Sequence, residues 1–337
     1  MTRAAMILLS IGTALFVGLL AWQGFGSVAS TLMVAGWGLA IVAAFHLLPL
    51  AFDAGAILAL SDRCDARGNA RMSMRDALLA RWVGESVNSL LPAGPIGGPV
   101  VMARNLAQRG IPMHDAAAAI TVSTTLQTLG QIVFALFGIA MFGAYAVHDS
   151  LVDLRAPMVA ATAVLSLFVV AFYWAQRQGL FGRILRTTSK AFGQHDWSAL
   201  KTRADAVDSA IHALYRDRRK VAATFTLSFV GWLVGTGEVW LALKFLGHPV
   251  DWLDALLLES VGQAIRGAAF AIPGALGAQE GGYLLLAPLV GLPPEAALAL
   301  SLAKRARELA LGLPGILYLH MSERNWRRRT RPIPVAD

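Results

Sequence analysis

An internal repeat is the feature of this sequence that most constrains its fold. The tetrapeptide Asp-Ala-Leu-Leu at residues 76–79 recurs at residues 254–257, and the Val-Gly pair at 83–84 recurs at 261–262, both at an offset of 178 residues. A three-residue insertion follows, after which Pro92 pairs with Pro273, residues 110–112 with 291–293, and residues 116–117 with 296–297 to within one place. The chain therefore contains two copies of one structural unit.

Composition places both copies in a membrane. Hydrophobic residues make up 56% of the 337 residues and charged residues only 15%, which is too apolar for a soluble domain with a polar exterior. The net charge of +8 does not indicate nucleic acid, because the basic residues lie in loops between apolar runs. Topology and anionic lipid headgroups explain that charge better, and membrane lipids are the expected partners.

Six apolar runs have the length of a membrane-spanning helix. They cover residues 4–22, 31–52, 116–144, 157–175, 221–246 and 295 to about 320. Arg3 also allows residues 4–22 to be read as a signal peptide, but the run is long for one and lacks a clear cleavage site, so an uncleaved span is preferred.

The distribution of Lys and Arg orients these spans. The amino end, residues 53–75, residues 176–220 and the basic tail 321–337 are predicted inside, and residues 23–30, 145–156, 247–253 and 288–294 outside. We expect a multi-pass protein of the bacterial inner membrane with both termini cytoplasmic. Within it, repeat one covers about 31–144 and repeat two about 221–320.

The connection at residues 176–220 has helical periodicity. Apolar residues recur at three-four spacing at Trp197, Leu200, Ala204, Val207, Ile211 and Leu214. An amphipathic helix is predicted, which either lies on the membrane surface or packs on the helix bundle.

Helix breakers interrupt the remaining two segments, 76–108 and 254–287. The expected breaks are Pro92, Gly94, Gly97 and Gly98 in the first segment and Pro273, Gly274 and Gly277 in the second. Non-helical backbone at membrane depth persists only when it is buried in protein or faces water. The predicted fold is therefore an all-α polytopic membrane protein with two re-entrant broken-helix hairpins, which enter from opposite faces as an inverted repeat.

Each hairpin carries one polar stripe. Arg81, Glu85 and Asn88 stand at i, i+4 and i+7, and Glu259, Gln263 and Arg266 repeat that spacing. These stripes either line a transport cavity, as in many inverted-repeat transporters, or form satisfied ion pairs that lock the bundle.

The final span concentrates charge. Lys304, Arg305 and Arg307 lie within one helical turn of a single carboxylate, Glu308, which leaves at least one cation without a partner on its own helix. An anion or the carboxylate of Glu280 would satisfy it. A phosphate headgroup fits, since half-helix starts after Gly98 or Gly277 are also anion sites.

Catalytic and cofactor motifs are absent from the sequence. No P-loop and no zinc-type Cys/His spacing occurs, the single Cys64 excludes an internal disulfide, and His46 is interpreted as a hydrogen-bonded core residue. We expect no enzyme activity, no cofactor and no metal.

The sequence NSLLPAGPIGG (88–98) with Arg104, and PGALGAQE (273–280), resemble the two signatures of the lysylphosphatidylglycerol synthase/flippase transmembrane-domain family, the membrane half of MprF-type proteins. The likeness covers nearly the whole chain, and residues 36–50 are most similar to the stand-alone HpnL branch associated with hopanoid lipids. The resemblance implies a lipid-translocating domain of paired hairpins. No aminoacyl-transferase domain follows residue 320, so lysyl-lipid synthesis is not implied.

The function expected from these observations is translocation of an amphipathic lipid, hopanoid-related or an anionic phospholipid. A scaffold that presents lipid to a lipid-modifying transferase is the alternative, and an intramembrane enzyme is the least favoured. The candidate lipid-binding residues are Arg81, Glu85, Asn88, Arg104, Glu259, Gln263, Arg266, Glu280, Lys304, Arg305, Arg307 and Glu308.

Overall fold

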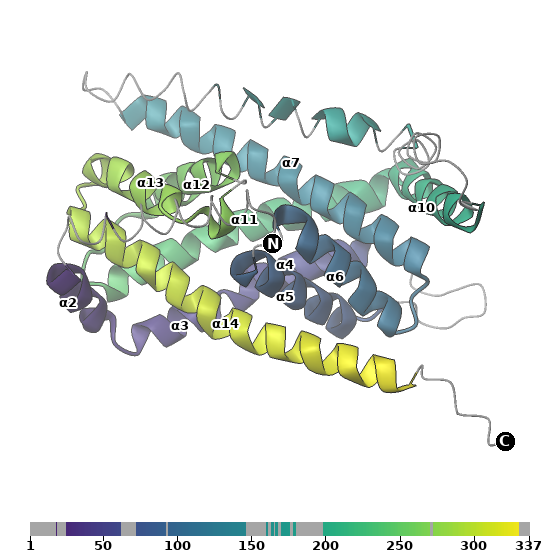
Figure 1. Cartoon of the computed structure of the whole chain (residues 1–337). Coiled ribbons are helices and arrows are strands. Elements are labelled where there is room, and N and C mark those ends of the chain that lie inside the picture. Colours follow the sequence, from purple (N-terminus) through teal and green to yellow (C-terminus); the bar gives the residue numbers. More distant parts are fainter. Residues whose placement is uncertain are drawn as a thin grey trace.

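The computed structural model describes residues 25–61, 72–91, 94–145, 198–269 and 272–329, together with residue 18 and scattered positions between 160 and 179. These residues form helices and turns, with no strand among them (Figure 1). The expected span 4–22, apart from residue 18, and several residues of the expected span 157–175 lie outside the described residues.

Three described helical stretches are long and apolar enough to cross a membrane: Gly38–Ala59, Met113–Ala140 and Arg218–Phe245. The first comprises α3 (Gly38–Phe45) and α4 (Leu47–Ala59), which meet at His46. The expected span 31–52 is wrong at both ends, because α2 (Phe25–Ala35) stops at a turn in which Gly36 adopts a φ of 47°. Only glycine takes such a conformation without steric cost, so the helix ends there.

The two segments with helix breakers are helix-break-helix units. In the first, α5 (Met74–Leu90) packs against α6 (Gly94–Gln108). In the second, α12 (Trp252–Ala268) leads through the short 3-10 helix η2 (Pro273–Ala275) into α13 (Ala278–Leu286) and a second 3-10 helix, η3 (Ala287–Val290).

The helix boundaries show the same offset as the repeat in the sequence. Both ends of α12 lie 178 residues after the ends of α5. The last helix of each unit, α7 (Met113–Tyr145) and α14 (Pro294–Arg329), begins 181 residues apart, as the three-residue insertion requires. The residue matches in the sequence therefore coincide with matching helix starts.

The first break is shorter than predicted. Gly94, Gly97 and Gly98 belong to α6, α5 ends at Leu90, and the predicted break residue Pro92 lies outside the described residues. The breakers are tolerated because they lie near the start of a helix, where the first N–H groups have no intrahelical acceptor. At the second break, by contrast, Gly274 and Gly277 adopt φ angles of 63° and 78°, so the interruption lies where the sequence predicts it.

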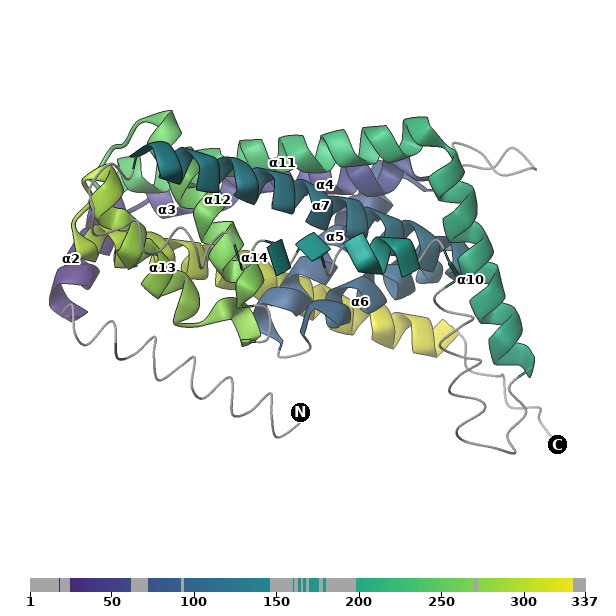
Figure 2. The ribbon, with the colours of Figure 1, turned by 90° about the horizontal axis from the view of Figure 1, so that it is seen from above.

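The long helices of the two units run in opposite directions. In Figure 1, α7 runs from right to left and α14 from left to right. α11 (Arg218–Phe245) runs from its junction with α10 at the right of Figure 2 to its connection with α12 at the left. α11 packs against both α4 and α7, and α14 packs against α5.

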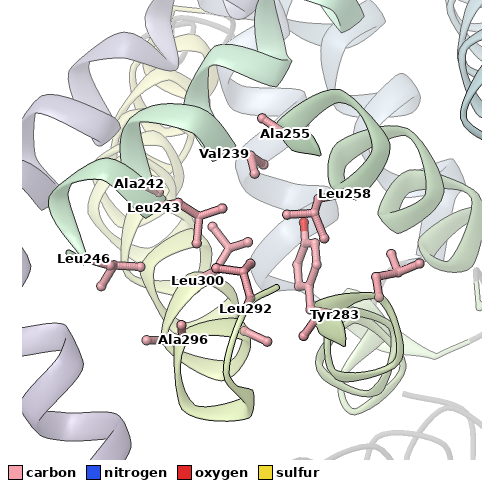
Figure 3. Close-up of a cluster of buried hydrophobic side chains, with 14 of the residues drawn as sticks. Val239, Ala242, Leu243, Leu246, Ala255, Leu258, Tyr283, Leu292, Ala296 and Leu300 are labelled. Atoms are coloured by element: carbon pink, nitrogen blue, oxygen red, sulfur yellow. The ribbon is translucent and has the colours of Figure 1, made fainter. Parts of the chain in front are cut away.

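The largest apolar core lies at one end of the molecule, between α11, α12, α13 and α14. Leu243, Leu258, Tyr283 and Leu300 contribute buried side chains from the four helices (Figure 3). This core holds the second hairpin rigidly against the final helix, and so fixes the polar residues that both elements carry.

Helices α10 and α14 bear on the expectations about the connection 176–220 and the tail 321–337. Helix α10 (Ser198–Arg216) packs on α7, with Ile211 fully buried beside Ala118 and Val122, so the packed alternative applies. The expected basic tail begins at residue 321, and α14 continues through the first part of it as a helix to Arg329. Glu323 and Ser322 contact α6 there, which extends the packed length of the helix.

Candidate functional site: a charged cavity between the repeats

A cavity of about 240 Å³ lies between α4, α5, α11, α12 and α14. Its lining is strongly polar for a chain of this composition. The charged and amide residues that line it are His46, Asp53, Arg81, Glu85, Asn88, Glu238, Glu259, Gln263, Arg266, Lys304, Arg307 and Glu308.

Nine of the twelve candidate residues line this cavity. Both polar stripes face the cavity. The residues at i, i+4 and i+7 on the two hairpins therefore meet at one place. Within the stripes, Arg81 lies 3.6 Å from Glu85, and the Gln263 amide donates to Glu259 at 2.8 Å. The other three candidates, Arg104, Glu280 and Arg305, lie outside the lining.

Glu280 caps a helix. Its side chain is fully buried, and Oε2 accepts the Gly277 N–H at 2.7 Å, at the start of α13. Oε1 accepts from the Ser301 hydroxyl at 2.9 Å and from Arg305 Nε at 3.2 Å. The half-helix start expected to bind an anion is thus occupied by a carboxylate of the same chain.

The Gly98 N–H in the second turn of α6 is also already paired within the chain. The Gly98 N–H donates to Asn88 Oδ1 at 2.9 Å, across the first hairpin. A β-carbon at Gly98 would lie 2.6 Å from the Asn88 amide, so the glycine permits this close approach. The expectation of a phosphate bound at these two helix starts is not supported by the geometry.

Arg104 lies far along α6 from the cavity and pairs with Glu323 of α14 at 2.5 Å. Its side chain is 47% exposed, whereas the cavity residues are largely enclosed. The hydrogen bonds from Arg104 hold the pKa of Glu323 below its ordinary value. This contact joins α6 to the end of α14 and does not involve the cavity.

The cations of the final helix find carboxylates on other helices. Lys304 reaches Glu259 of α12 at 2.5 Å, and Arg307 reaches Glu238 of α11 at 2.9 Å. Glu308 is shared between Arg305 at 3.1 Å, as the i, i+3 spacing predicts, and Arg266 at 2.9 Å. Lys304 and Arg307 thus have their closest carboxylates on other helices, and Arg305 also reaches Glu280 at 3.2 Å, the carboxylate that the sequence offered as an alternative to an anion.

A sequence model described as the lysylphosphatidylglycerol synthase TM region matches residues 7–315. The chain belongs to this family. Neither the curated proteins nor the solved structures compared with it contain a match. Membership of the lysylphosphatidylglycerol synthase transmembrane family supports a membrane protein with a lipid-related function.

Three more charged residues line the cavity of this family member. Sequence reasoning did not identify them as site residues. Asp53 accepts from Arg81 Nη2 at 2.7 Å and from the Gln127 amide at 2.6 Å. Glu238 and His46 are 2.7 Å apart, and His46 also lies 2.7 Å from Glu85. His46 is hydrogen-bonded, as predicted, but it faces the cavity.

A signal for these residues exists in the sequence. Glu238 is the one carboxylate in the apolar helix α11, and Asp53 follows directly on an apolar run. An ionisable residue inside a spanning helix indicates a functional site by default, because its burial in lipid is costly.

Proposed function

We propose that this protein translocates an amphipathic lipid between the leaflets of a membrane, with the headgroup passing through the charged cavity. The observation that carries the proposal is that polar residues from both repeat units line one cavity in an otherwise apolar chain. A hopanoid-related lipid, in line with the HpnL resemblance, and an anionic phospholipid are the substrates we consider.

The cost of burying charge supports this proposal. A charged side chain at mid-membrane costs at least about 2.5–3.5 kcal/mol on insertion scales, so charged residues there usually pair or line a polar passage. Here they do both, since the pairs stand at the wall of a cavity. A headgroup carries donors and acceptors that exchange with these pairs, so that neither the lipid nor the protein leaves a charge uncompensated.

The arrangement of the helices supports a transporter topology. We infer six full spans, two re-entrant hairpins and cytoplasmic termini, with the two units inverted relative to each other. The opposite directions of α7 and α14 support the inversion. Inverted units with broken helices beside one central site give alternating access by rocking of one unit against the other.

The closed ion-pair network favours one alternative, a scaffold that presents lipid to a transferase and moves none. Every cation that borders the cavity has a carboxylate within 3.6 Å among the described residues. Such a network would also serve only to lock the helices together. We propose no enzymatic reaction in either case.

Lipid movement in reconstituted vesicles tests the proposal. Purified protein is incorporated into phosphatidylethanolamine/phosphatidylglycerol vesicles that contain trace lipid of either class, labelled on its apolar part. Label that reaches the outer leaflet is followed by chemical quenching. We expect faster redistribution of at least one labelled lipid than in protein-free vesicles.

A matched pair of double variants separates the cavity from other ion pairs. Arg81→Gln with Asp53→Asn removes a cavity pair without changing net charge, and should slow redistribution several-fold. Arg104→Gln with Glu323→Gln makes the same chemical change outside the cavity, and should leave the rate unchanged. A parent protein that moves neither lipid faster than protein-free vesicles would favour the scaffold.

A further inference from the structure

The two ring nitrogens of His46 differ in their hydrogen-bond neighbours: one faces an acceptor only, and the other faces both an acceptor and a donor. Nδ1 lies 2.7 Å from Glu238 Oε2, so it must carry a hydrogen that it donates to this carboxylate. Nε2 lies 2.7 Å from Glu85 Oε1 but also 2.8 Å from Arg307 Nη1. One neighbour of Nε2 is an acceptor and the other is always a donor.

These two neighbours cannot both be satisfied by one protonation state. When Nε2 carries a hydrogen, it donates to Glu85 and turns no lone pair toward Arg307. When Nε2 is bare, it accepts from Arg307, and Glu85 Oε1 loses its closest donor. The presence of one proton thus decides whether His46 is bonded to α5 of the first unit or to α14 of the second.

The charge balance of the cluster requires the same proton. In the described part of the chain, the permanent cations are Arg81, Arg266, Lys304, Arg305 and Arg307, whereas the carboxylates are Asp53, Glu85, Glu238, Glu259, Glu280 and Glu308. Five cations face six carboxylates, so protonated His46 makes the cluster neutral. An unbalanced charge in a low-dielectric interior is costly, which favours the protonated state at rest.

Every helix packed around His46 contributes a charged group to this balance. Glu85 and Arg81 come from α5, Glu238 from α11, and Arg307 with Glu308 from α14. Asp53 lies on α4, the same element that His46 precedes. His46 and Glu85 both line the cavity, so water or a headgroup in the cavity has access to the proton.

We propose that His46 carries the one exchangeable proton of the cavity, and that its release and return accompany each passage of a headgroup. This proposal rests on the proposed lipid translocation. A cationic headgroup donor that binds Glu85 replaces both the N–H and the positive charge of His46, whose proton leaves to cavity water, and Nε2 then accepts from Arg307. Lipid and proton move in opposite directions, which would let a proton gradient drive lipid asymmetry.

A transmembrane pH difference tests the coupling. The same vesicles, with acyl-labelled phosphatidylethanolamine or phosphatidylglycerol, are given an imposed pH difference, and label in each leaflet is measured at steady state after subtraction of protein-free vesicles. With one proton per lipid, a difference of one pH unit should shift the leaflet ratio by up to about tenfold. Dissipation of the gradient with a protonophore and a potassium ionophore should return the ratio to its starting value.

Two variants remove the proton, and the label movement that remains in each is tested for a response to the gradient. His46→Gln has no titrating group. Glu85→Gln makes five cations face five carboxylates with neutral His46, whose bare Nε2 accepts from Arg307. Whatever rate of redistribution remains in either variant, its leaflet ratio should not respond to the gradient. His320→Gln, at an exposed position on α14, should respond like the parent.

The outcomes distinguish this proposal from the proposed function. Label that moves in the parent faster than in protein-free vesicles, but with the same leaflet ratio with and without the gradient, overturns the coupling and leaves translocation standing. A response that persists in Glu85→Gln also overturns it, even if His46→Gln fails to fold. No protein-dependent movement of either label removes translocation, and the coupling with it.

Discussion

Lys304 and Glu259 show what single residues contribute to this fold. Both side chains are nearly inaccessible, and their 2.5 Å contact joins α14 to α12. Moving two charges out of water costs free energy. Their mutual attraction offsets this cost only when both charges are present. Such pairs stabilise the bundle little overall but make each partner intolerant of change alone.

The first prediction concerns the loss of one partner. Lys304→Met should destabilise the protein by about 3–5 kcal/mol, because Glu259 is left buried with only the Gln263 amide as donor. The double change Lys304→Met with Glu259→Met should recover most of that loss. Thermal unfolding of purified protein in one detergent measures both.

A surface pair provides the control for this prediction. Arg104→Ala removes the partially exposed contact with Glu323, and should cost no more than about 1 kcal/mol. Equal losses of stability for Lys304→Met and Arg104→Ala would show that the buried pair matters no more for stability than the exposed pair. By the same reasoning Arg305→Ala should be harmful, since it strands the fully buried Glu280.

The residues that sequence reasoning found and missed differ in their surroundings. Arg81, Glu85, Glu259 and Arg266 stand out because they repeat at one spacing beside helix breakers. Their partners do not, because an ion pair between helices joins residues whose separation in the sequence carries no signal. Arg307 and Glu238, for example, meet only after α14 has folded against α11.

At the scale of helices, each unit packs its last helix on the hairpin of the other. α7 packs on α12, and α14 packs on α5. Both contacts have a glycine opposite a serine, Gly138 with Ser260 and Gly315 with Ser86. Because each final helix packs on the other unit, neither unit is complete alone. Movement of one hairpin therefore displaces the final helix of the other unit.

The second prediction tests this close approach. A β-carbon at Gly138 would lie 2.0 Å from Ser260 Oγ and 2.6 Å from its Cβ, so Gly138→Ala should cost about 1–3 kcal/mol. Gly281→Ala, in α13, meets nothing within 4 Å and should be neutral or stabilising. Thermal unfolding compares the two variants, and equal midpoints would contradict a tight α7–α12 contact.

Helix ends were predictable only where backbone conformation decides them. Gly274 and Gly277 need positive φ angles, and the break lies at those residues. Gly94, Gly97 and Gly98 have the same composition signal but lie in a helix, in which Asn88 accepts the Gly98 N–H and Pro99 is accommodated in the interior. Composition alone does not distinguish a break from a helix start.

Across the whole molecule, basic residues gather at one end. Arg216 and Arg218 mark the junction of α10 and α11 at the right of Figure 2, where the end of α14 with Arg327 also lies. At the opposite end, the connection between α11 and α12 contains Asp251 and no Lys or Arg. The asymmetry supports the proposed orientation, with the basic end in the cytoplasm.

The third prediction tests that orientation. In a Cys64→Ser background, a cysteine at the exposed Pro249 should react with a membrane-impermeant thiol reagent in intact cells, and one at the exposed Arg75 should react only after permeabilisation. The reversed pattern would invert the topology. Reaction of both in intact cells would place the two positions on one side, against an inverted repeat.

The small number of strongly apolar helices also has a consequence for how the chain is made. Among the described residues, only Gly38–Ala59, Met113–Ala140 and Arg218–Phe245 are apolar enough to enter a bilayer unaided. Helices α5, α12 and the charged middle of α14 would leave ionised groups in lipid if they were inserted one at a time. During synthesis they must therefore wait at the membrane surface or in the insertion machinery until their partners arrive. Because Glu259 of α12 needs Lys304 of α14, we expect the central part of the protein to assemble only after Lys304 has left the ribosome.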